Sequence, residues 1–197
     1  MTSWDSSNIH LASSLTGNVK GKKLCYIKEI CDIVKPKYGI ITSIGEAHLE
    51  TFGSRDNIVK GKFELVESLP SDGVAILNMD DKNQVNYKIQ NDCKVIWIGI
   101  DNKDADVIAS NIEISLDGMS FDVEFKEDKV THKFFTKLLG KVNIYNILAV
   151  YSAMSVMGVN TEDFNRILSD YKPQVGRMEV INLGKPFILH LFSSHVL

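Results

Sequence analysis

The sequence is short of cysteine and of net charge, and each shortage excludes a class of protein. Its three cysteines, Cys25, Cys31 and Cys93, form no CxxC pair and are odd in number. They indicate free thiols in a reducing compartment rather than a disulfide framework. The formal net charge is only -3 over 197 residues, and no basic patch is interleaved with aromatics. We therefore expect neither nucleic acid nor an anionic membrane surface as a partner.

Long apolar runs are also missing. A membrane-spanning helix needs about 20 consecutive apolar residues, and no run in this chain approaches that length. The N-terminal stretch "MTSWDSSNIHLASSL" has neither the basic start nor the apolar core of a signal peptide. These absences favour a cytoplasmic protein with no membrane partner, and we expect it to be a monomer.

The chain nevertheless contains enough apolar residues for a sizeable core, 44% by composition. Apolar, β-branched runs predict strands near residues 38–44, 74–79 and 94–100. An apolar stripe at helical spacing predicts a helix over residues 55–69, between the first two strands. Strands and helices that alternate in this way form parallel β-α-β units. The predicted fold class is therefore α/β, with a mostly parallel sheet flanked by helices.

The remaining segments complete the predicted domain organisation. Residues 1–24 are polar and carry no sustained period, so we expect a poorly ordered leader. The main domain is assigned to residues 25–188. Within it, about residues 106–138 approach strict alternation around an Asp117-Gly118 turn, which predicts a small antiparallel β subdomain. Residues 189–197 are expected to be a tail that diverges from the pattern of this domain.

Two further helices are predicted near the end of this domain. The first begins near Asn143, interpreted as its N-cap, and stops at Gly158. It is apolar almost all round, which predicts packing inside the domain. The second is short and begins with Thr161 as its N-cap.

Lys62 is the first candidate site residue, because it falls inside the apolar stripe of the predicted 55–69 helix. At about 100° per residue it projects between Val66 and Leu69, whereas Lys60 lies on the opposite, solvated side. One interpretation is a snorkelling lysine, whose stem covers apolar surface while its ammonium reaches water. The other is a lysine held in a site.

His48 is the second candidate. It belongs to "GEAHLE", which follows the strand predicted near residues 38–44, and loops at the carboxyl ends of parallel strands are where open α/β sheets bind ligands. His48, with Glu46 and Glu50 nearby, could supply a metal ligand, since imidazole and carboxylate are usual ones. The alternative is an ordinary polar loop.

Two later stretches suit a nucleotide. In "GKVNIYN", Asn146 lies one turn into an apolar helix, where a buried amide needs a partner such as a nucleobase edge. In "PQVGRME", the planar guanidinium of Arg177 suits a phosphate, although a surface salt bridge is the commoner role of an arginine.

Five blocks of the sequence resemble the central ATP-binding domain of the Mur ligases, and they follow one another in the same order and at about the same spacing as in that domain. They are "TSIGEAHLETFGS", "GKFEL", "LPSDGVAILNMDD", "LLGKVNIYNILAV" and "VGRME", and the resemblance covers roughly residues 27–188. Mur ligases use ATP to phosphorylate a substrate carboxylate, and an amine then attacks the acyl phosphate to leave an amide, ADP and phosphate. The resemblance implies an ATP-dependent acid–amino-acid ligase with ATP and Mg²⁺ as cofactors.

The resemblance also implies roles for the candidate residues. His48 would be a magnesium ligand. Lys62 would be the catalytic lysine that takes up carbon dioxide as a carbamate and so faces the magnesium. Burial favours this chemistry, because it lowers the pKa of the amine. Asn143 and Asn146 would belong to the ATP site, with Asn146 against the adenine, and Arg177 would reach the phosphates.

Within the family, the wording "GEAHLE" favours the ligases that join D-alanyl-D-alanine to UDP-N-acetylmuramoyl-tripeptide in peptidoglycan assembly. These two compounds are therefore the expected substrate partners. Ligases that act on lipid-linked cell-wall precursors or on folate are alternatives. A non-catalytic domain, vestigial or nucleotide-binding, is a further one.

The chain also departs from the family pattern. Ser43 and Val142 stand where asparagine and histidine are usual. Only "GNVKGKK", residues 17–23, approaches the phosphate loop GxxxxGK[ST], and it has too few residues between its glycines and no Ser or Thr after its lysine. The resemblance breaks off after "GKPFIL". We therefore expect a fragment that lacks the phosphate loop and the C-terminal domain and that does not ligate alone.

Overall fold

The computed structural model describes residues 9–11, 27–45, 53–127, 129–171, 177–182 and 186–190. The chain divides into two compact units, unit one over Met1–Val107 and unit two over Ile108–Leu197. The boundary falls beside Asp106, where the sequence changes from short buried runs to alternation. In the described part of the chain, no helix is both long and apolar enough to cross a membrane.

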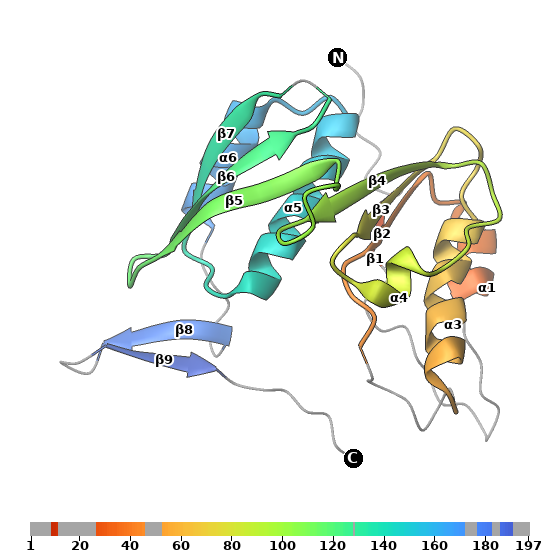
Figure 1. Cartoon of the computed structure of the whole chain (residues 1–197), viewed down its shortest axis with the longest axis horizontal. Coiled ribbons are helices and arrows are strands. Elements are labelled where there is room, and N and C mark those ends of the chain that lie inside the picture. The colour runs from red at the N-terminus through yellow and green to blue at the C-terminus, as the bar shows by residue number, and fades with distance from the viewer. Residues whose placement is uncertain are drawn as a thin grey trace. The chain divides into compact units, whose positions relative to one another are not determined.

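Unit one is built on a parallel sheet (Figure 1). Its strands β1 (Ile9–Leu11), β2 (Tyr38–Ile41), β3 (Val74–Asn78) and β4 (Lys94–Gly99) are neighbours in this order, and every pair is parallel. All five residues of β3 are buried, as expected of a central strand in a sheet that is covered on both faces. The three predicted strands and the α/β class are confirmed.

Two helices, α1 (Ile27–Val34) and α3 (Arg55–Glu67), lie side by side next to these strands (Figure 1). Ser54 caps α3, because its hydroxyl accepts a hydrogen bond from the Asn57 backbone N–H at 3.2 Å. The predicted apolar stripe of α3 is buried, with Phe63 and Val66 fully inaccessible to solvent. The short helix α4 (Lys82–Val85) follows β3 directly and is capped by Asp81.

The leader contains more structure than the sequence predicts. Residues 9–11, inside the segment expected to be poorly ordered, form β1 and pair with β2 in parallel register. That part of the expectation is wrong. Three residues are too few to show a period in the sequence, but the edge of β2 offers unpaired backbone groups that such a short segment can satisfy.

Unit two carries the antiparallel strands. β5 starts at the boundary and covers Val107–Ile114, and β6 (Met119–Phe125) pairs with β7 (Thr131–Thr136) in antiparallel register. The predicted turn between β5 and β6 is confirmed: the Ser115 N–H donates to the Gly118 carbonyl at 2.8 Å. Strands β8 (Arg177–Asn182) and β9 (Pro186–His190) form a separate antiparallel pair.

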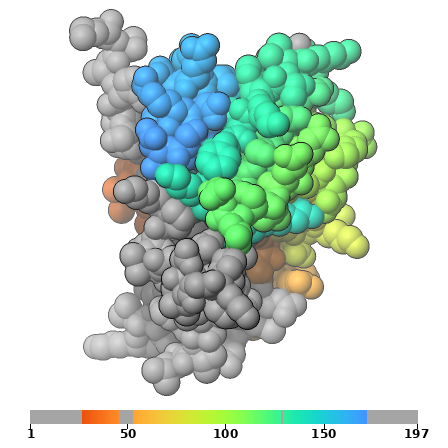
Figure 2. Space-filling model, turned by 90° about the vertical axis from the view of Figure 1, so that its left-hand side faces the viewer, coloured from red at the N-terminus to blue at the C-terminus, as the bar shows by residue number. Residues whose placement is uncertain are grey.

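Helices α5 (Lys141–Val156) and α6 (Thr161–Asp170) complete unit two, and α6 contributes to its surface (Figure 2). Tyr151 of α5 joins the aromatic core, with its ring 4.9 Å from that of Phe134 and 5.0 Å from that of Phe164. Its hydroxyl lies 2.9 Å from the Thr161 hydroxyl. This core holds the two helices against the strand β7.

Three sequence-based predictions about these helices are wrong. The N-cap of α5 is Gly140, not Asn143, and that of α6 is Asn160, whose side chain accepts from the Glu162 N–H. The Asn143 amide instead donates back to the Leu139 carbonyl at 2.7 Å, and the Thr161 hydroxyl is engaged by Tyr151. Nor is α5 packed all round, since Val142 and Val150 are exposed. The predicted stop at Gly158 is confirmed by its positive φ of 78°.

Candidate functional site

Lys62 reaches the carboxyl end of β2. Its ammonium donates a hydrogen bond to the Ser43 carbonyl at 2.8 Å, two residues beyond the last residue of that strand. The Lys62 side chain is half-buried, and its two neighbours in the sequence, Gly61 and Phe63, are buried. The side chain of Lys60 is exposed. The hydrogen bond holds the ammonium at one carbonyl, which the second interpretation of Lys62, a lysine held in a site, requires and the snorkelling interpretation does not.

Burial also changes the chemistry of this amine. It lowers the pKa of Lys62 below the ordinary lysine value, and the nearby Asp81 carboxylate only partly opposes this shift. A lysine with a lowered pKa carries more neutral amine at a given pH, and the neutral amine is the nucleophile. This environment therefore favours the neutral, nucleophilic form of Lys62.

The segment that accepts the Lys62 hydrogen bond is fixed by side chains from the end of β3 and the turn that follows it. The Thr42 carbonyl accepts from the Asn78 amide at 3.2 Å, and the Ile44 N–H donates to the Asp81 carboxylate at 2.7 Å. These bonds take the chain out of the sheet ladder, which is why β2 ends at Ile41 and not near residue 44 as predicted. The Ser43 carbonyl thus lies between two fixed residues.

Gln84 organises this turn from the interior. Its side chain is fully buried, its carbonyl accepts from the Asn78 N–H at 2.9 Å, and its amide donates to the Asp81 carboxylate at 3.1 Å. Gln84 is not among the candidate residues of the sequence analysis. The available signal was "NMDDKNQ", a dense run of carboxylates and amides directly after a parallel strand.

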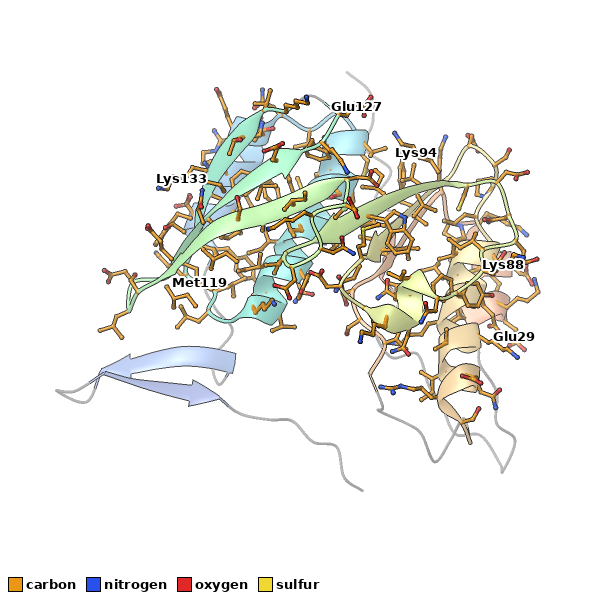
Figure 3. All side chains as sticks on the ribbon, viewed as in Figure 1. Glu29, Lys88, Lys94, Met119, Glu127 and Lys133 are labelled. Carbon is orange, nitrogen blue, oxygen red and sulfur yellow. The ribbon has the colours of Figure 1, made fainter. Side chains whose placement is uncertain are left out.

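Asp80, next in the chain, joins β3 to the end of β4. Its carboxylate accepts from the backbone N–H groups of Ile100 at 2.7 Å, Asp101 at 3.1 Å and Asn102 at 2.7 Å. The carboxyl ends of three adjacent strands are therefore tied together by Asp80 and Asp81. Figure 3 labels Lys94 at the amino end of β4, the opposite end of that strand from this site.

A second candidate site lies within unit two, in a cavity of about 380 Å³ beside α5 and α6. This volume falls in the range of small-molecule sites. Asn143 and Asn146 provide polar groups, and the remaining lining is largely apolar: Leu138, Ile147, Val150, Met154, Phe164, Ile167, Leu168 and Tyr171. The expectation that Asn146 is buried is wrong. It is exposed, and its amide lies 3.5 Å from the Asn143 carbonyl oxygen, because it sits on the open side of α5.

The other predicted site residues lie wholly or partly outside the described part of the chain. His48, with Glu46 and Glu50, lies outside the described residues, as does "GNVKGKK". Arg177 is the first residue of β8, where only its backbone is described. Among the described residues, no group of three or more His, Cys, Asp or Glu side chains is placed to hold a metal ion.

The fold and these positions define an α/β domain with a half-buried lysine at the carboxyl edge of a parallel sheet. Residues 22–154 match the family described as Mur ligase middle domain. The match spans well over half of the chain, and the chain therefore belongs to the Mur ligase family.

Curated relatives extend over most of this chain. The UDP-N-acetylmuramate–L-alanine ligase of Alkaliphilus metalliredigens is 33% identical over 164 residues, which is 79% of this chain and 35% of that protein. The UDP-N-acetylmuramoyl-tripeptide–D-alanyl-D-alanine ligase of Bacillus subtilis is 31% identical over 150 residues, 76% of this chain and 31% of that protein. The chain thus spans about a third of the length of these relatives.

Solved structures agree on the fold. MurF from Acinetobacter baumannii superimposes with a TM-score of 0.72 at 25% identity, over 83% of this chain and 35% of that one. MurF from Thermotoga maritima, solved in complex with ADP, gives a TM-score of 0.65 at 20% identity, over 78% of this chain and 35% of that one.

Proposed function

We propose that this chain supplies the ATP-binding middle domain of an ATP-dependent ligase of peptidoglycan precursors, in which Lys62 serves as a carbamate. The observation that carries the proposal is the half-buried Lys62 amine, held at the carboxyl end of β2 by the Ser43 carbonyl. Membership of the Mur ligase family supports it. The relatives are named as ligases of UDP-linked muramoyl compounds.

The carbamate would explain why a lysine is half-buried here, where burial disfavours its charged ammonium form. The Lys62 ammonium first releases one proton to solvent. The neutral amine then attacks the carbon of carbon dioxide, an N–C bond forms as one C–O π bond opens, and a second proton leaves to solvent, so that a cation is replaced by an anion. Mg²⁺, when bound, would neutralise the charge on the transferred phosphoryl group. The carbamate of Lys62 and the imidazole of His48 are the groups proposed to hold it, since both are ordinary ligand types for hard or intermediate cations.

The nucleotide is proposed to use the cavity in unit two. An apolar slot with a few convergent polar groups is the usual form of a small-molecule site. The Asn146 carboxamide offers both a donor and an acceptor, which matches the edge of adenine, and Asn143 lies beside it. Arg177 is proposed to meet the phosphates. The ADP complex of the Thermotoga maritima relative agrees with a nucleotide as the ligand.

For the substrates, we propose UDP-N-acetylmuramoyl-tripeptide and D-alanyl-D-alanine. The Bacillus subtilis relative carries that name at 31% identity, and MurF from Acinetobacter baumannii is a structural match at a TM-score of 0.72. Relatives at similar identity are named for L-alanine or for 2,6-diaminopimelate. The family does not by itself select the amine, so the direct comparison is a ligation assay with each of the three amines, run on a ligase of full family length that contains this domain.

The carbamate at Lys62 is tested by chemical trapping. The chain is equilibrated with bicarbonate, alkylated with a trialkyloxonium salt that esterifies carbamates, and digested for mass spectrometry. We expect an added alkoxycarbonyl group on Lys62 and none on Lys60, which lies two residues away in the same helix. Equal modification of both lysines, or modification of neither, would remove the main support for the proposed function.

A further inference from the structure

The contacts around Lys62 form a continuous chain of hydrogen bonds that starts in the interior. Buried Gln84 donates to the Asp81 carboxylate at 3.1 Å, and Asp81 accepts from the Ile44 N–H at 2.7 Å. The preceding residue, Ser43, accepts from the Lys62 ammonium at 2.8 Å. The helix α3 brings Lys62 to this end of the sheet, but the turn after β3 fixes the group that its ammonium meets.

The backbone on either side of Ser43 is fixed by contacts from one segment of unit one. The residue is exposed and lies beyond the end of β2. In the described part of the chain, the bonds to its two neighbours come from residues 78–83, at the end of β3 and the start of α4. The Asn78 amide donates to the Thr42 carbonyl at 3.2 Å, the Asn83 amide donates to the Ile44 carbonyl at 3.4 Å, and the Asp81 carboxylate accepts from the Ile44 N–H. The Asp81 bond is the shortest of the three and the one that involves a charge, so it is the strongest of them.

We propose that Asp81 is a positioning residue for Lys62, which it holds through the Ile44 N–H and the Ser43 carbonyl, with Gln84 orienting the Asp81 carboxylate. Its importance for catalysis rests on the proposed function of Lys62. The positioning of Lys62 by Asp81 does not depend on that function, because it concerns the lysine before it reacts.

The Asp81 carboxylate is suited to this task because hydrogen bonds fix both of its oxygens. One oxygen accepts from the Asn83 N–H at 2.9 Å and caps α4, and the other accepts from both Ile44 and Gln84. Three donors therefore fix one carboxylate. A group fixed in this way can hold a loop at a site with little additional loss of conformational freedom.

The test uses Asp81→Ser in the whole chain. Serine is itself a good N-cap, so the α4 cap is kept, but its hydroxyl is too short to reach Ile44. Asp72→Ser is the matched control, since Asp72 is an exposed acid that pairs with Lys37 elsewhere in unit one. The Ile100 amide, held by Asp80, reports whether the rest of the sheet edge is intact.

Two readouts are taken at one fixed pH in carbonate-free buffer. The first is the ratio of acetylation of Lys62 to that of Lys60 on the same peptide after brief treatment with acetic anhydride. The second is hydrogen exchange of the Ile44 amide. In Asp81→Ser we expect both to rise, each by about fivefold for a lost hydrogen bond, while the Ile100 amide stays protected and Asp72→Ser matches wild type. Asp81→Asn, which keeps the side-chain size but loses an acceptor on one side, should change both in the same direction by less.

An unchanged ratio, or a rise in only one of the two readouts, would overturn the proposal. Loss of the direct charge effect of Asp81 on Lys62 would raise the acetylation ratio alone, whereas loss of the proposed route through Ile44 raises both readouts. If Asp81→Ser also exposes the Ile100 amide, Asp81→Asn decides by the same criteria. Neither readout needs carbon dioxide, Mg²⁺ or ATP. A chain that never forms the carbamate but shows the expected change in Asp81→Ser would contradict the proposed function and leave this inference standing.

Discussion

At the scale of single residues, the environment of Lys62 determines what that lysine can do. Unfolded chain presents a lysine in water, while the folded protein half-buries it and lowers its pKa. Folding therefore opposes protonation of this one group. The same burial that favours the neutral, nucleophilic amine also makes the charged form costly for the fold.

This cost has a pH dependence whose sign can be tested. Because the pKa of Lys62 is lower in the folded than in the unfolded protein, the unfolded state binds more protons between these two values, and the contribution of Lys62 to stability rises with pH through that window. We expect urea unfolding to show that the free energy of unfolding of wild type, relative to Lys62→Met, increases as pH rises from neutrality towards the ordinary lysine pKa. A flat or falling difference would contradict the burial of this amine.

At the scale of secondary-structure elements, two neighbouring carboxylates join three strands. Asp80 accepts three backbone N–H groups after β4, and its loss would leave them without that acceptor. We expect Asp80→Ala to lower the free energy of unfolding by about 2 kcal/mol or more, since a lost charged acceptor typically costs that much. Asp92→Ala, at an exposed acid between α4 and β4, should change it by less than about 0.5 kcal/mol. Equal effects would show that the Asp80 contacts add nothing to stability.

The turn between β5 and β6 offers a second test at this scale, with a control built into the chain. Gly118 has a φ of 148°, and a Cβ there would collide with the Thr136 carbonyl oxygen, whereas Gly158, with a φ of 78°, faces open space. Gly158→Ala should cost about 1 kcal/mol for its left-handed backbone alone. Gly118→Ala should cost clearly more, as measured by thermal or urea unfolding. A smaller loss for Gly118→Ala than for Gly158→Ala would contradict the close approach of β7.

The sequence predicts those elements that depend on local signals, and it fails where tertiary contacts decide. Buried β-branched runs and the apolar stripe of α3 are local signals, and the corresponding strands and helix form as predicted. The caps of α5 and α6 were predicted wrongly, because the partners of Asn143 and Thr161 depend on tertiary contacts. Gln84 was missed for the same reason: its two partners are set by the way β3 leads into α4. The exposure of Asn146 likewise depends on which side of α5 is covered.

At the scale of the whole molecule, the two units carry different parts of the proposed reaction. Unit one holds Lys62 and the carboxylates that fix its surroundings, and unit two holds the cavity proposed for the nucleotide. The chain spans about a third of the length of relatives that are named as ligases. Nucleotide binding is therefore the part of the activity that this chain can be asked to show by itself.

The most direct test of the account is a titration of the chain with ATP and Mg²⁺, followed by NMR through the side-chain amide signals of Asn143 and Asn146. We predict saturable shifts of these signals with a dissociation constant on the order of millimolar, about 4 kcal/mol. Asn146→Ala should weaken binding about tenfold, and Asn86→Ala, at an exposed asparagine in unit one, should leave it unchanged. Binding that is absent, or that is equally strong in Asn146→Ala, would contradict the assignment of unit two as the nucleotide site.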